Sequence, residues 1–184
     1  AFLSDKEVYL DANIDVFTEG FFGSSATSDL ETLFQLIYLT MTQPRVDAVT
    51  LEQYIDDALP LAEDPSINPN YAQFKALIEI RYDDPRYQLL DVDDLNSVTA
   101  TAVERVFVDR FGDASDWTFS FSGDFDIDAA TDLARTYLGT LPATGRFEAV
   151  DYIEPPAPEG AIVETVQAGE GDQASVLFLI TGPG

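Results

Sequence analysis

The sequence predicts an α+β fold, and three observations lead to this class. Hydrophobic residues make up 46% of the 184 residues and aromatic residues 12%, which is enough for a packed core. Apolar residues recur with helical spacing through most of the first 140 positions. Shorter segments at the beginning, after residue 116 and after residue 160 alternate between apolar and polar residues, as β-strands do.

The first forty residues predict two strands followed by a helix. The strands are expected at Glu7–Ala12 and Ile14–Phe22, where apolar residues alternate. Ser28 and Glu31 have the spacing of a capping box, in which the serine accepts a backbone hydrogen bond and the glutamate reaches back. Apolar residues then recur at helical spacing until Pro44, which ends the helix.

The middle of the chain is predicted to be mostly helical. The prolines around Asp64–Pro69 indicate a loop between two of its helices. Helical spacing predicts helices at Thr50–Leu59, Tyr71–Tyr82 and Thr99–Phe111, a short turn at Asp91–Asn96, and a last helix that Asp126 caps and Gly139 closes.

The plainest strand signal is Trp117–Ser122. Its odd-numbered residues are aromatic and its even-numbered residues are Thr or Ser, a pattern typical of a strand with one face on a core. We expect the aromatic face to be buried against Val103, Val106 and Phe107 of the preceding helix. The alternative is that the aromatic residues line a groove.

Prolines mark the end of the first predicted domain. Four prolines fall between residues 142 and 160, where little periodicity is left, and this composition indicates a linker. Two predicted strands, Ala161–Gln167 and Ser175–Thr181, follow with a turn-like sequence between them. We therefore predict a domain at 1–148, a Pro-rich linker at 149–160, and the first strands of a similar second domain at 161–184.

The charge of the chain limits its partners. There are 34 acidic residues against 9 basic ones, a formal net charge of −25. Binding to DNA or RNA phosphates needs clustered Lys and Arg, so sequence-independent nucleic-acid binding is excluded and anionic membranes are disfavoured. The acids either adapt the surface to high salt or attract cationic peptides or metal ions; their scatter along the chain favours salt adaptation.

Cysteine and histidine are both absent. No disulfide, thiolate nucleophile, zinc finger or Ser-His-Asp triad can therefore be built from this chain. The longest apolar runs are too short to span a bilayer, and no signal peptide opens the chain, although residue 1 need not be the start of the parent protein. We expect no catalytic residue and no metal ligand here.

The acidic and glycine-rich motifs have structural explanations. Asp124–Asp128 is spaced like a calcium loop but lacks the glycine and the glutamate of an EF-hand, so we interpret Asp126 as a helix cap. The adjacent pairs at 83–84 and 93–94 diverge, and we expect them in solvated loops and caps. Residues 20–25 are glycine-rich but fit neither phosphate-loop pattern.

Two segments resemble a known family. Residues 23–47, with the run SDLETLFQLIYL followed by PRVD, resemble the first-domain helix of the C-terminal half of bacterial pitrilysin-like peptidases. Residues 122–142, with SGDFD, YLG and LP, resemble a segment present in each half of that family. The order and separation of the two segments fit as well, and the match as a whole, from the first segment to the Pro-rich linker, spans most of the chain.

The resemblance implies a two-layer α+β sandwich, with a mostly antiparallel sheet and helices on one face. In the pitrilysin/insulinase family an inverted HxxEH helix binds zinc, and two halves close around the peptide. Because this chain has no histidine, the resemblance implies the non-catalytic half of a zinc endopeptidase, forming part of the peptide-enclosing chamber. No catalytic or metal-binding residue carries over, and the helical Glu79 without histidines is not a zinc ligand.

The implied partners are the catalytic half of the same protein, or a partner subunit, and peptide substrates. Zinc would lie in the catalytic half, so no cofactor is expected in this chain. The family suggests a periplasmic or secreted protein. Two other readings stay open: a structural or assembly subunit of the same fold with no peptidase activity, and an unrelated acidic binding module.

We predict that the chain unfolds at a higher temperature as sodium chloride is added. The excess acidic side chains of a chain with net charge −25 repel one another and destabilise the folded state. Salt screens this repulsion, because the screening length falls from about 30 Å at 0.01 M salt to about 3 Å at 1 M. Thermal melts over this range test the prediction, with sucrose at matched osmolality as the control for solute exclusion. A midpoint that stays flat or falls with salt would contradict it.

Overall fold

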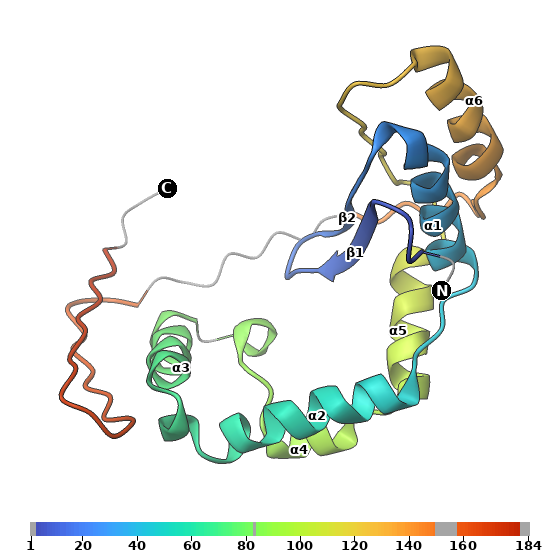
Figure 1. The fold of residues 1–184 in the computed structure, drawn as a ribbon. Coiled ribbons are helices and arrows are strands. Elements are labelled where there is room, and N and C mark those ends of the chain that lie inside the picture. Colours follow the sequence, from blue (N-terminus) through green and yellow to red (C-terminus); the bar gives the residue numbers. More distant parts are fainter. Residues whose placement is uncertain (1–2, 83, 150–157, 181–184) are drawn as a thin grey trace. The chain divides into compact units, whose positions relative to one another are not determined.

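The computed structural model describes residues 3–82, 84–149 and 158–180 (Figure 1). These residues form helices and a two-stranded antiparallel sheet, which confirms the α+β class. The chain divides into two compact units: unit 1 comprises Ala1–Asp47 and Thr99–Asp151, and unit 2 comprises Ala48–Val98 and Tyr152–Gly184. None of the helices described is long and apolar enough to cross a membrane.

Unit 1 begins with the predicted strand pair, at shifted boundaries. Strand β1 (Val8–Ile14) pairs antiparallel with β2 (Glu19–Ser25), with Val8 opposite Ser25 and Ile14 opposite Glu19. The second strand starts later than predicted because a turn separates the two, closed by a 2.7 Å hydrogen bond from the Asp15 N–H to the Thr18 carbonyl.

The helix that follows, α1 (Leu30–Thr42), lacks the predicted capping box. A 3-10 turn, η1 (Thr27–Asp29), takes its place. The Asp29 carboxylate accepts hydrogen bonds from Lys6 Nζ (2.8 Å) and from the Glu7 N–H (3.0 Å), which lower its pKa. Glu31 accepts the Tyr137 hydroxyl at 2.9 Å, so its side chain points to a later helix and not back to Ser28.

Helices α5 (Ala100–Phe111) and α6 (Ile127–Tyr137) begin as the sequence predicted, and α5 also ends as predicted. The predicted end of α6 is wrong, because Gly139 lies within a 3-10 turn, η4 (Leu138–Thr140), that follows the helix. Thr99 caps α5 by accepting the Ala102 N–H at 3.2 Å. The N–H of Gly112, the residue after α5, donates to the Val108 carbonyl at 3.0 Å. Asp126 caps α6 by accepting the Ala129 N–H at 2.8 Å.

The core of unit 1 lies along α1. Leu33, Ile37 and Met41 of this helix are buried together with Leu141, and partly buried residues of β1, β2 and the segment after α5 pack against them. The two most deeply buried large side chains are Phe34 on α1 and Phe111 at the end of α5, each 1% exposed. Burial of this apolar surface is the main stabilising term of the unit.

The segment Trp117–Ser122 is not a strand, which corrects the prediction. Its alternation is real, since the aromatic residues are half-buried and the Thr and Ser residues are exposed. A ladder is absent because no described backbone lies in register beside it. The predicted partners are also wrong in part: Val106 is 49% exposed, and Trp117 contacts Phe111 and Phe21, with ring centroids 5.5 and 5.2 Å apart.

Unit 2 contains the helices α2 (Ala48–Glu63), α3 (Pro69–Arg81) and α4 (Val92–Ser97), and α2 packs against α4. Asn68 caps α3, accepting the N–H groups of the second and third helical residues. Asp91 and Asp94 form a reciprocal capping box at α4. The short turn predicted at 91–96 is therefore a capped helix.

The strands predicted at 161–167 and 175–181 are not formed within the described residues, 158–180. Val163 is 88% exposed and Phe178 is 84% exposed, so the apolar alternation has nothing to pack on. An isolated hairpin is marginal in water, which explains the missing ladder. Residues 150–157 of the predicted linker lie outside the described residues, and the domain boundaries at 148 and 160 stay a prediction.

Phe111→Ala should lower the free energy of unfolding of unit 1 by about 3–5 kcal/mol, as truncation of a buried phenylalanine does. Phe111 is 1% exposed and contacts three other aromatic rings. Phe147→Ala is the matched control, because Phe147 is 82% exposed. Urea unfolding measures both. Equal losses in the two variants would contradict the burial of Phe111.

Candidate functional site

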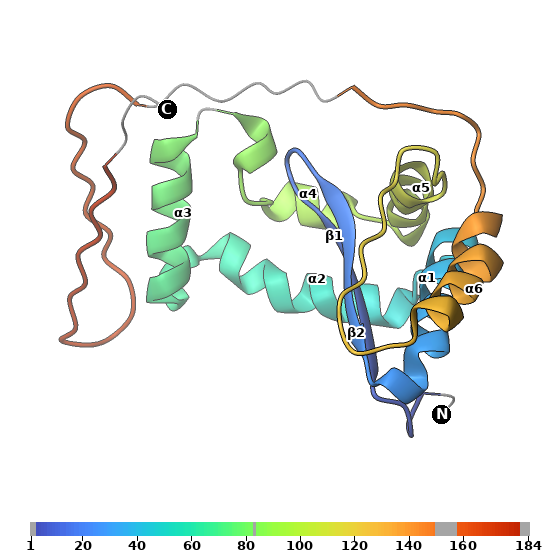
Figure 2. The ribbon, with the colours of Figure 1, turned by 90° about the horizontal axis from the view of Figure 1, so that it is seen from above.

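A groove of about 850 Å³ lies within unit 1 and is the candidate functional site. Its lining comes mainly from β2 and from residues 116–125, two segments that lie side by side in Figure 2. Leu30, Leu33 and Ile37 of α1 add apolar surface. Grooves that bind ligands commonly have volumes of this order.

The glycine-rich stretch in the groove wall is part of strand β2 and not a phosphate loop. A Cβ atom at Gly23 would lie 2.8 Å from the Tyr9 carbonyl oxygen and 3.1 Å from side-chain atoms of Leu10 and Leu33. Only glycine therefore lets β2 approach the core this closely. At Gly20, in contrast, a Cβ would meet open space.

Within the described part of the chain, each long wall of the groove presents a backbone edge that has no β-ladder partner. Among the described residues, β2 pairs with β1 alone. Residues 118–123 make no backbone–backbone hydrogen bond to any other described residue, although the Trp117 N–H donates to Ala114 at 3.3 Å. Water satisfies such groups, or another extended chain does.

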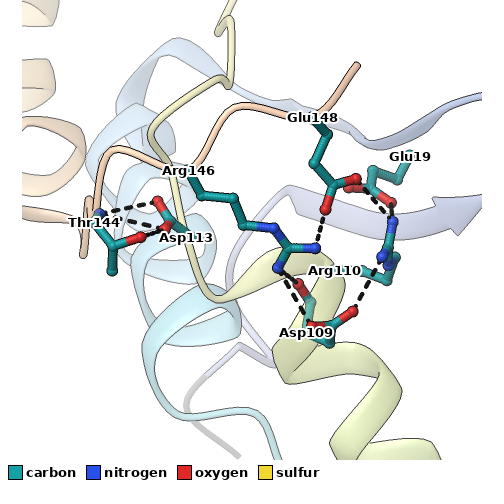
Figure 3. Close-up of polar contacts among 7 residues, drawn as sticks. All are labelled: Glu19, Asp109, Arg110, Asp113, Thr144, Arg146 and Glu148. Carbon is teal, nitrogen blue, oxygen red and sulfur yellow. Dashed lines mark hydrogen bonds and ion pairs between the residues drawn. The ribbon is translucent and has the colours of Figure 1, made fainter. Parts of the chain in front are cut away.

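The lining of the groove is acidic. Its described lining residues include five carboxylates and one basic side chain, Arg110. The guanidinium of Arg110 contacts Asp109 (3.0 Å), Glu148 (3.0 Å) and Glu19 (3.5 Å), as Figure 3 shows. The hydrogen bond with Asp109 contributes most to raising the pKa of Arg110. The lining carboxylates are Asp15, Glu19, Asp116, Asp124 and Glu148.

A second arginine continues the ion-pair network at the end of α5. Arg146 contacts Asp109 at 3.3 Å and also binds Glu148 (Figure 3). Arg110, followed by Arg146, lowers the pKa of the Asp109 carboxyl. Because Arg110 and Arg146 share Asp109 and Glu148, the segment after α6 is held against α5.

Asp113 holds the segment after α6 through hydrogen bonds that its carboxylate accepts from uncharged groups. Its carboxylate accepts hydrogen bonds from the Ser115 N–H (2.9 Å) and the Ser115 hydroxyl (2.5 Å). It also accepts one from the Thr144 hydroxyl, which Figure 3 shows. These bonds, with Ser115 the largest cause, hold the pKa of Asp113 well below its usual range. Glu148 adds a backbone N–H bond to Asp116 at 3.0 Å, so residues 144–148 follow residues 113–116.

The structure explains the Asp124–Asp128 motif without calcium. Asp126 caps α6, and the backbone carbonyl of Asp124 accepts the Thr27 hydroxyl at 2.8 Å. Among the described residues, no three His, Cys, Asp or Glu side chains are placed to hold a metal ion. A zinc ion also has no fitting ligand set here, since the chain contains neither histidine nor cysteine.

The other acidic candidates serve local structure. Asp84 binds Arg86, which lowers the pKa of its carboxyl to about 2, while Asp83 lies outside the described residues. Asp94 belongs to the capping box of α4. Glu79 accepts a 2.6 Å hydrogen bond from Lys75 on the same helix.

Sequence reasoning named the aromatic residues as a possible groove lining but missed the acids and Arg110. The acids come from the turn after β1, from β2, from the segment after α5 and from the segment after α6. No local motif connects these places. Only the charge balance of the whole chain pointed to an acidic site.

The fold of the chain is that of pitrilysin/insulinase-type peptidases. It is similar to the periplasmic protease PqqL from Escherichia coli, with a TM-score of 0.69 and 19% sequence identity, covering 86% of this chain. It is also similar to a mutant of the ferredoxin protease FusC, whose structure was determined with Arabidopsis ferredoxin, with a TM-score of 0.65, 15% identity and 85% coverage. The chain spans 17% of the length of each.

These similarities show the fold alone. No protein-family model matches the sequence, and no curated protein matches it.

Replacing Asp113 with asparagine should destabilise unit 1 near neutral pH and have less effect in acid. A carboxyl with a lowered folded-state pKa stabilises the fold above its ordinary value of 3.8, and this contribution is lost as the pH falls below 3.8 toward the folded value. Urea unfolding of Asp113→Asn at a series of pH values measures it.

The matched control is Glu104→Gln, which removes an exposed carboxylate from α5 in the same unit. The difference between the native chain and Asp113→Asn should shrink below pH 3.8, while the Glu104→Gln difference stays small. A difference for Asp113→Asn that is constant from pH 7 into acid would show that ionised Asp113 contributes nothing.

Proposed function

We propose that this chain belongs to the non-catalytic half of a pitrilysin-like zinc endopeptidase and forms part of the wall that encloses peptide substrates. The observation that carries the proposal is the acidic groove on a fold shared with two proteases. The groove offers apolar surface and negative charge to a peptide, and no three His, Cys, Asp or Glu side chains among the described residues are placed there to hold a metal ion.

The chemistry then belongs to the other half of the parent. A zinc-bound water would hydrolyse the peptide bond there. The contribution of this chain is to hold the peptide near that centre, which raises the effective concentration of substrate. The long-range field of a chain with charge −25 favours cationic peptides in the encounter.

The partners follow from this arrangement. We expect the chain to associate with the catalytic half of the same protein or with a zinc-bearing subunit. We also propose a periplasmic or secreted location for the parent, which the likeness to the periplasmic protease PqqL supports.

Adding this chain to the separately expressed catalytic half should increase cleavage of a basic peptide. The gain should shrink as sodium chloride is raised, because screening weakens the attraction between acidic groove and basic peptide. Initial rates with a quenched fluorescent peptide measure it, and an acidic peptide of equal length is the matched substrate control. The chain alone should cleave neither peptide, with or without added zinc.

Two outcomes would contradict the proposal. Chelator-sensitive cleavage by the pure chain would show that it is not the non-catalytic half. A catalytic half that is fully active alone and unaffected by the addition would remove the enclosure role. An assembly subunit of the same fold, with no peptidase activity, would then be the better reading.

A further inference from the structure

We propose that the N-terminal end of α3 is a docking site for the glycine turn at residues 168–171, and that this contact positions the chain after residue 158 on unit 2. The inference goes beyond the proposed function, because it concerns how segments of this chain are held together and needs neither peptide nor metal. It rests on a backbone carbonyl that its own turn leaves without a donor, a glycine that fits beside it, and a second contact on α3.

The Ser66 carbonyl is the first part of the docking site. Ser66 belongs to a 3-10 turn, η2 (Pro65–Ile67), which Asp64 caps by accepting the Ser66 N–H at 3.0 Å and its hydroxyl at 2.6 Å. A helical continuation would satisfy the Ser66 carbonyl from the third or fourth residue ahead. Pro69 has no N–H, and the N–H of Asn70 donates to the side chain that caps α3, at 3.1 Å. The local sequence therefore leaves this carbonyl to a donor from elsewhere.

Gly169 supplies that donor. Its N–H donates to the Ser66 carbonyl at 2.9 Å, and this is the one backbone–backbone hydrogen bond that residues 158–180 make among the described residues. Gly169 has a φ of +74°, a left-handed conformation that glycine adopts readily. A Cβ atom here would lie 2.7 Å from Cγ of Pro69, so only glycine brings its N–H this close to η2.

A second contact lies one turn further along α3. Gln73 Nε2 donates to the Ser175 hydroxyl oxygen at 3.1 Å, and Pro69 and Gln73 are four residues apart, on one face of the helix. Ala168 is half-buried, whereas residues 170–180 are all exposed. The hydrogen bonds described for this segment therefore hold it at two points, at η2 and on α3.

These two contacts restrict the position of the segment more than a linker does. Segments that are joined by a linker and share no interface take many relative positions. The bonds to Ser66 and Gln73 favour one of them. The docked form is reversible, because the net contribution of a single hydrogen bond shifts an equilibrium by only about fivefold.

The exchange rate of the Gly169 N–H in deuterated solvent, followed by NMR on the full chain, tests the contact. It should be slower than the rates at Gly160 and Gly171, whose N–H groups donate to no described backbone carbonyl. Gln73→Ala removes the second contact and should speed exchange at Gly169 about fivefold, the effect of losing one hydrogen bond. The matched control Gln53→Ala removes an exposed glutamine of α2 and should leave the rate unchanged.

Distance measurements test whether the contact positions the segment. The chain has no cysteine, so spin labels on Glu79→Cys in α3 and Thr165→Cys in the segment report one distance. Gly169→Ala should broaden the distribution of this distance, because the added Cβ meets Pro69. Gly160→Ala is the matched control and should leave the distribution unchanged, since Gly160 has a similar φ of +79° but a Cβ there would meet open space.

Each result decides for or against the docking site. Exchange at Gly169 as fast as at Gly160 and Gly171 would overturn it, because the Ser66 carbonyl would then not be the acceptor. Broadening that is equal in Gly169→Ala and Gly160→Ala, or absent from both, would also overturn it. Slow exchange together with broadening confined to Gly169→Ala would support it, whether or not the chain takes part in peptide cleavage.

Discussion

The contact of Phe21, Phe111 and Trp117 is the constraint on which unit 1 depends. Their ring centroids lie 4.9 to 5.5 Å apart, and the three residues come from β2, from the end of α5 and from the extended segment that follows. Because that segment forms no ladder, packing of its side chains positions it along the core. These rings, with the Phe34–Phe121 stack, hold the backbone of the groove wall in place.

Structural features whose hydrogen-bond partners lie within a few residues could be predicted from the sequence. The caps Thr99 and Asp126 bond to N–H groups three residues ahead, so the local pattern contains all the information. The capping box at Ser28 failed because Lys6 and the Glu7 backbone bind Asp29 from 22 or 23 positions away. A competing partner so distant leaves no trace in the local pattern.

The groove illustrates a second limit. The alternation at residues 117–122 correctly predicted which side chains are half-buried and which are exposed. A two-residue period carries no information about which backbone lies alongside, so the absence of a β-ladder could not be predicted. The lining acids are drawn from sites up to 133 positions apart, Asp15 to Glu148. Their convergence results from the fold and not from any local pattern.

The exposed apolar segment after residue 175 gives the acidity of the chain a further role. Val176, Phe178 and Ile180 are 76%, 84% and 92% exposed, and no charged residue interrupts the run 174–180. Such an exposed apolar segment is a template for self-association. Mutual repulsion between copies of charge −25 opposes that association, so the acidity of the chain protects this segment against aggregation.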